Sequence, residues 1–95
     1  PDVNTEDEML DYYRQNATTT FHLMGTCRMG PESDPTSVVD DQLRVRGLEG
    51  LRVADASIMP TMPSANTNAA TIMIGEKCAD YIRGQHLPPV DLASK

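Results

Sequence analysis

The chain has 95 residues, a net charge of −6 and an aromatic content of 4%, with no tryptophan. This length supports one small domain or a piece of a larger one, with a thin core. No cluster of Lys or Arg exceeds two residues, which argues against nucleic-acid and anionic-membrane partners. No apolar run approaches the ~18 residues of a membrane span. Because the chain begins at Pro1, we interpret it as processed or partial, and its compartment stays open, with the cytoplasm slightly favoured.

The first predicted element is a helix over residues 6–16. Thr5 and Glu8 stand at the spacing of a capping box, in which each satisfies the backbone N–H of the other. Residues 17–24, "ATTTFHLM", are β-branched and aromatic, which predicts a short strand. The stretch 25–35 follows as a predicted loop.

The middle of the chain contains the tripeptide "LRV" twice, at 43–45 and 51–53, separated by "RGLEG". Alternation in both copies and the glycines between them predict two short strands joined by a tight turn. Residues 60–68, "PTMPSANTN", are a predicted loop that its prolines keep extended.

The last predicted element is an amphipathic helix with Asn68 as N-cap and Gly84 as its stop. Its apolar side chains recur every four residues, at Ala70, Ile74, Cys78 and Ile82. The first turn carries no Asp or Glu, so its unpaired N–H groups and partial positive charge are free for an external group. An ordinary buried helix start explains that turn equally well. Residues 85–95 are interpreted as a tail.

The sequence predicts neither a metal site nor a complete nucleotide site. The His and Cys residues show no structural-zinc spacing, and Cys27 and Cys78 are expected to be free thiols. The His and Cys residues of the chain are His22, Cys27, Cys78 and His86. Nothing matches the Gly-rich dinucleotide or P-loop patterns. His22 alone fits a packed interior histidine, and Asn66 alone a cap or turn residue. Asp55, after the apolar "LRVA", fits a turn former or an acceptor for ligand hydroxyls.

Three blocks in order, "HLMGTCRMG", "SVVDDQLRVRGLEGLRVADASIMPT" and "SANTNAATIMIGEKCADYI", closely resemble the C-terminal end of glucose-methanol-choline (GMC) flavoprotein oxidoreductases. The resemblance covers roughly residues 20–84 and is nearest the choline dehydrogenase and alcohol oxidase branch. It implies an α+β fragment of a two-domain flavoprotein. Residues 1–45 would complete the substrate-binding domain, 46–84 would return to the FAD-binding domain as strand, loop and helix, and 85–95 would be the C-terminal tail.

The resemblance implies FAD-dependent oxidation of a primary alcohol to an aldehyde by hydride transfer to flavin N5. His22 falls on the active-site histidine of the family, which takes the hydroxyl proton. Asn66 falls on the second member of the catalytic pair, and its amide can hold the alcohol oxygen but cannot act as a base. His22, whose imidazole suits proton transfer near neutral pH, is therefore the base candidate.

The resemblance also implies the residues that bind the cofactor. Asp55 and Ala56 fall where the family contacts the ribityl–pyrophosphate part of FAD. The helix start at Thr67, Asn68 and Ala69 falls where backbone amides face the N1–C2=O edge of the flavin ring, and Asn66 is also expected to bind the cofactor. A positive helix end there would stabilise the negative charge that develops on flavin reduction.

The implied partners are the N-terminal FAD-binding portion of the same enzyme and a small alcohol. One departure from the family pattern is Leu23, where proline is common; with Met24 it could shape the substrate cavity or simply pack. Two alternatives remain: a lyase or photodecarboxylase on the same scaffold, and a non-catalytic structural module.

Overall fold

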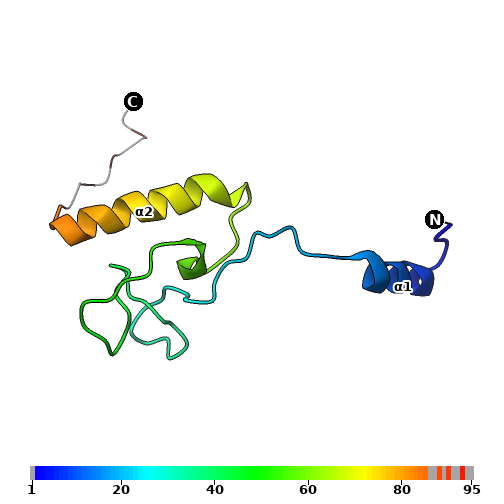
Figure 1. Ribbon diagram of the computed structural model, residues 1–95, viewed down its shortest axis with the longest axis horizontal. Coiled ribbons are helices and arrows are strands. Elements are labelled where there is room, and N and C mark those ends of the chain that lie inside the picture. Colours follow the sequence, from blue (N-terminus) through cyan, green and yellow to red (C-terminus); the bar gives the residue numbers. More distant parts are fainter. Residues whose placement is uncertain (1, 86–87, 89, 91–92, 94–95) are drawn as a thin grey trace.

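The computed structural model describes residues 2–85, 88, 90 and 93. Within them lie the α-helices α1 (Glu6–Asn16) and α2 (Thr67–Arg83) and the short 3-10 helix η1 (Ala56–Ile58). Figure 1 shows α1 at the far end of an extended arm, whereas α2 lies over η1 and the loops that precede it. Of these three elements, only α2 and η1 pack against each other.

The N-terminal helix forms as predicted. Thr5 Oγ1 accepts a hydrogen bond from the Glu8 N–H at 3.2 Å, and a Glu8 carboxylate oxygen accepts one from the Thr5 N–H at 3.0 Å. No residue of α1 is buried, and its large apolar side chains are 44–66% exposed. These side chains are Met9, Leu10, Tyr12 and Tyr13. Local capping therefore defines α1, and none of its apolar side chains belongs to the core.

The predicted strand over residues 17–24 is wrong. This segment is irregular, and residues 17–23 are all exposed. The chain bends at Phe21, whose φ of 60° lies in the left-handed region. A strand needs a neighbouring strand to receive its N–H and C=O groups, and the described residues provide none beside this segment.

The loop that follows is fixed against η1 by its backbone. The N–H groups of Gly25, Cys27 and Met29 donate to three successive carbonyls, those of residues 56, 57 and 58, at 3.3, 2.9 and 2.8 Å. A single parallel bridge also joins Met29 to Val39. The predicted loop over 25–35 is thus irregular, and backbone hydrogen bonds hold its first residues against η1.

The two "LRV" tripeptides pair antiparallel, as predicted. The Val45 N–H donates to the Leu51 carbonyl at 3.0 Å, and the Val53 N–H to the Leu43 carbonyl at 3.1 Å. Regular strands do not form, however. Only isolated bridges occur in the described residues, including one between Arg44 and Arg52. The helical part of the predicted α+β fragment is confirmed, and its strand part is reduced to these bridges.

Two arginines hold the loop between Met29 and Val45 together. Arg28 pairs with Asp34 at 2.9 Å. Arg46 donates to Ser37 Oγ at 2.9 Å and to the Gly30 carbonyl at 2.6 Å. The backbone passes so close at Gly30 that an added Cβ would lie 2.8 Å from the Ser37 Cβ, so this position requires glycine.

The core is small and joins the loops to α2. Its buried members are Val39, Leu43, Ile58, Met59, Ile74 and Cys78. Cys27 and Cys78 are both free thiols, as predicted. No helix within the described ranges is long and apolar enough to span a bilayer. His86 and much of the predicted tail lie outside the described residues.

The predicted N-cap of the last helix is corrected by two residues. Asn66, not Asn68, caps α2: its backbone is non-helical (φ −55°, ψ 140°), and its Oδ1 accepts from the Asn68 N–H at 2.9 Å. Asn is a favoured N-cap residue, and both positions hold Asn, so the sequence pattern alone does not tell which of the two caps the helix. The predicted stop is confirmed, because Gly84 adopts the left-handed conformation (φ 69°) that ends many helices.

Candidate functional site

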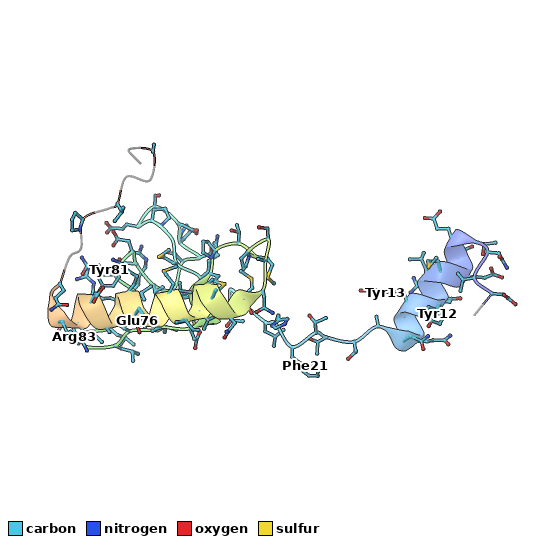
Figure 2. The ribbon with its side chains drawn as sticks, turned by 90° about the horizontal axis from the view of Figure 1, so that it is seen from above. Tyr12, Tyr13, Phe21, Glu76, Tyr81 and Arg83 are labelled. Carbon is cyan, nitrogen blue, oxygen red and sulfur yellow. The ribbon has the colours of Figure 1, made fainter. Side chains whose placement is uncertain are left out.

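His22 lies beside the first turn of α2. Its Nδ1 is 3.2 Å from the Thr67 Oγ1, although the two residues are 45 positions apart in the sequence. The approach is set by the preceding bend, in which the Phe21 N–H donates to Thr19 Oγ1 at 3.0 Å. Figure 2 shows Phe21 on the extended segment that passes this end of α2. His22 is exposed in this chain, so its imidazole is accessible to a bound molecule.

Asn66 is exposed, and its side-chain oxygen is already used. Oδ1 accepts the hydrogen bond from the Asn68 N–H that caps the helix. The two N–H groups of Nδ2 are left as donors. Asn66 can therefore donate to an oxygen of a ligand while it caps α2.

The first turn of α2 contains no acidic residue, as the sequence predicts. Asn68 gives its N–H to the cap, whereas the N–H groups of Thr67 and Ala69 donate to no group in the described part of the chain. Thr71 Oγ1 donates back to the Thr67 carbonyl at 2.8 Å. Two backbone donors at the positive end of the helix dipole thus remain available to an electron-rich group.

Asp55 caps η1. Its Oδ1 accepts from the Ser57 N–H at 2.7 Å. Hydrogen bonds from the side chain and then the backbone of Ser57 lower the pKa of the Asp55 carboxyl. Asp55 is exposed, while the neighbouring Ala56 is half-buried and its carbonyl receives the Gly25 N–H.

The structure brings four of the predicted site residues into one cluster and places two beside it. The cluster is His22, Asn66, Thr67 and Asn68. Asp55 and Ala56 make no contact with it among the interactions of the described residues, but they belong to η1 and its cap, and η1 packs against α2. In the described residues no group of three or more His, Cys, Asp or Glu could hold a metal ion.

The two candidate residues after the histidine differ in their surroundings. Met24 is partly buried and packs against the core, which assigns it the packing role. Leu23 is 80% exposed, so its side chain is free to contact a group outside this chain.

Sequence reasoning missed three contributors to the geometry. It assigned Thr67 only through its backbone, whereas the Thr67 side chain contacts His22. It also placed Thr19 and Phe21 in a strand, whereas they form the bend before the histidine. The run of three threonines before Phe21 was the available signal, because Thr hydroxyls accept from N–H groups two residues on and favour turns.

The protein-family model for GMC oxidoreductases matches residues 1–75 of the chain. Among curated relatives, the chain is 54% identical over 93 residues to the oxygen-dependent choline dehydrogenase of Cronobacter sakazakii, covering 98% of this chain and 16% of that protein. It is 52% identical over 90 residues to the oxygen-dependent choline dehydrogenase 1 of Chromohalobacter salexigens, with 94% and 16% covered.

A solved structure agrees with these relatives. The crystal structure of pyridoxine 4-oxidase from Mesorbium loti superposes with a TM-score of 0.75 at 40% identity, covering 88% of this chain and 16% of that chain. The present chain therefore spans about 16% of the length of the relatives it matches. The family model matches residues 1–75, the curated relatives are more than half identical, and the solved structure shares the backbone. These findings agree with the cluster that contains His22 and Asn66, and they show that the chain belongs to the GMC oxidoreductase family.

Proposed function

We propose that the complete protein is an FAD-dependent oxidoreductase that converts a primary alcohol to an aldehyde, with His22 as the base. The observation that carries this proposal is the 3.2 Å contact between His22 and Thr67, which holds the histidine next to Asn66 at the start of α2. Family membership supports the reaction class. The names of relatives, choline dehydrogenase and pyridoxine 4-oxidase, support an alcohol as the substrate class.

Two side chains divide the work on the alcohol hydroxyl. His22 Nε2 accepts the hydroxyl proton, as a neutral imidazole can near neutral pH. Asn66 donates from Nδ2 to the same oxygen and stabilises the negative charge that grows there as the proton leaves, because its Oδ1 is occupied by the cap. An amide takes no proton at this pH, so the two roles cannot be exchanged.

The residues around α2 and η1 fit a flavin cofactor. The first turn offers the N–H groups of Thr67 and Ala69 without a competing carboxylate, which suits an electron-rich ring edge. The exposed carboxylate of Asp55 would accept from ligand hydroxyls, and Ala56 lies beside it. FAD, when bound, would supply the acceptor for the hydride that leaves the alcohol carbon.

The proposal requires the remainder of the enzyme, because this chain spans about 16% of its relatives. Nothing within the described residues covers α1, and His22 and Asn66 are exposed. We propose that the N-terminal portion of the same protein encloses the site and supplies the rest of the flavin-binding surface. The division at residues 45 and 46 between substrate-binding and FAD-binding domains stays a prediction.

The test is His22→Ala in the complete, flavin-loaded enzyme. Loss of the base should lower turnover of an alcohol substrate by about 10²- to 10⁴-fold, while the visible flavin spectrum shows that the cofactor is retained. His86→Ala, a change at the only other histidine of the chain, is the matched control and should leave turnover near wild type. A loss below tenfold in His22→Ala would assign the base to another residue.

The reaction class needs its own measurement. When the wild-type enzyme is mixed with choline, pyridoxine or a simple primary alcohol in the absence of oxygen, at least one of them should bleach the oxidised flavin absorbance. An unchanged spectrum with all three classes of alcohol would contradict alcohol oxidation and favour a lyase or photodecarboxylase on this scaffold.

A further inference from the structure

In the described residues, the side chain of Thr67 forms a hydrogen bond with the imidazole of His22. It occupies the first position of α2, where the Asn66 cap fixes the start of the helix. Thr67 is half-buried, and the branched β-carbon restricts its χ1 angle. The hydroxyl is therefore held in place by the helix, whereas His22 belongs to an irregular segment that has few contacts of its own.

The contact bears on which ring nitrogen of His22 carries the proton. A neutral imidazole has one N–H donor and one nitrogen lone pair, and the hydrogen bond at one nitrogen sets the state of the other. If Nδ1 carries the proton and donates to Thr67 Oγ1, Nε2 has a free lone pair. If Nδ1 accepts from the hydroxyl instead, Nε2 carries the proton and cannot take another from an alcohol.

We propose that Thr67 is a positioning residue for His22: its hydroxyl oxygen accepts a hydrogen bond from Nδ1–H, which orients the ring and leaves Nε2 as the proton acceptor. The proposal rests on the proposed function, in which His22 is the base. The same oxygen still accepts from Nδ1–H after Nε2 has taken the proton, because both ring nitrogens then carry hydrogen. The hydrogen bond thus persists across the transfer, and it strengthens when the donor becomes charged.

Three variants of the complete, flavin-loaded enzyme separate this role from helix stability. Thr67→Val removes the hydroxyl and keeps the branched shape. Thr67→Ser keeps the hydroxyl and removes the methyl group. Thr71→Val is the matched control, because it removes a hydroxyl one turn later that bonds to the Thr67 carbonyl and not to His22. The Asn66 cap is unchanged in all three.

The kinetic expectation is a change in kcat without a matching change in KM. Thr67→Val should lower kcat by about 10- to 100-fold, the cost of a reacting group that is no longer aligned. Thr67→Ser should recover most of the wild-type kcat, and Thr71→Val should resemble wild type. Equal losses in Thr67→Val and Thr67→Ser would show that the methyl group and packing matter instead, and would overturn the proposal.

The direct readout is the tautomer of His22 by NMR of enzyme labelled with ¹³C-histidine. The His22 signal is identified as the one absent from His22→Gln. We expect the Nδ1–H form in wild type and Thr67→Ser, and a shift toward the Nε2–H form in Thr67→Val. An Nε2–H form in wild type, or the same tautomer in wild type and Thr67→Val, would overturn the proposal.

The two experiments also distinguish failure of the base assignment from failure of the positioning role. If His22→Gln keeps more than a tenth of the activity while Thr67→Val still changes the tautomer, His22 is not the base although Thr67 orients it. If His22→Gln is inactive while Thr67→Val has wild-type kcat and tautomer, His22 is the base without help from Thr67.

Discussion

The side chain of Asn66 carries two kinds of hydrogen-bonding group, and α2 uses only one of them. Oδ1 caps the helix by accepting from the Asn68 N–H, and Nδ2 is left to donate. An N-cap is worth about 0.5–2 kcal/mol relative to alanine, so Asn66 supports both the position of α2 and the chemistry that we propose. These two contributions can be separated by substitution.

Asn66→Asp and Asn66→Ser both retain an oxygen that caps α2 but lose the amide donors. In the complete enzyme we expect both to lower kcat/KM for the alcohol while the melting temperature stays close to wild type. Asn66→Ala should lower kcat/KM and the melting temperature together, because it also loses the cap. Wild-type activity in Asn66→Ser, measured by steady-state kinetics beside thermal melts, would limit Asn66 to capping.

At the scale of single residues, the sequence predicted His22 and Asn66 through the family resemblance, and the structure places both at one end of α2. It did not predict the Thr67 hydroxyl contact, because that contact joins segments 45 residues apart. Local propensity places Thr67 at a helix start and carries no information on which loop passes beside it.

The loop between Met29 and Val45 is an element fixed by carboxylates. Hydrogen bonds from the side chain and N–H of Thr36, with the Arg28 guanidinium beside them, lower the pKa of Asp34 from its ordinary value of 3.8. Burial would raise the pKa of Asp40, but hydrogen bonds from Arg44 and Gln42 outweigh burial and lower it. A carboxyl whose pKa is lowered on folding stabilises the fold above its ordinary pKa. That contribution is lost as the pH falls through the lowered value.

We therefore expect the complete enzyme to lose stability as the pH falls below about 4, partly through this loop. Asp34→Asn should make the melting temperature less dependent on pH between about 5 and 3, since it removes one of the groups that must be protonated. Asp41→Asn is the matched control, because the exposed Asp41 has no partner in the described residues. Thermal melts over this pH range check the expectation, and identical slopes for wild type and Asp34→Asn would contradict it.

Among the elements, both helices were predictable because their caps and spacing are local. The capping box of α1 and the Gly84 stop of α2 depend on neighbouring residues alone. The strand predicted at 17–24 failed because strand formation depends on a partner segment, which the sequence of the strand does not encode. The pairing of the two "LRV" tripeptides could be predicted because they are close in the sequence and are joined by one short turn.

The whole chain is more extended than a self-contained domain. Its radius of gyration is 18.9 Å, whereas a compact chain of this length would have about 12–13 Å. Figure 1 shows α1 at the end of an extended arm, away from the rest of the chain. Large apolar side chains on α2 are also 54–66% exposed, namely Ile72, Met73 and Ile82. These surfaces are the ones that we expect the rest of the enzyme to cover.

Residues 1–95 expressed alone should therefore show no cooperative thermal transition by circular dichroism and should bind a hydrophobic dye such as ANS. The physical reason is that the six buried apolar side chains of the described residues provide too little core to offset the conformational entropy of the chain. A sharp melt without flavin and without the remainder of the protein would contradict this expectation and favour a stable, non-catalytic module.

The backbone contact between residues 25–29 and η1 has a practical consequence for protein engineering. Three successive carbonyls, at 56, 57 and 58, tie the segment after His22 to the segment after Asp55. His22, the proposed proton acceptor, and Asp55, the proposed cofactor ligand, thus belong to segments that are hydrogen-bonded to each other, and Thr67 adds a hydrogen bond to His22 itself. A segment exchanged between family members should therefore include residues 22–67 together, because a shorter graft would cut one of these connections.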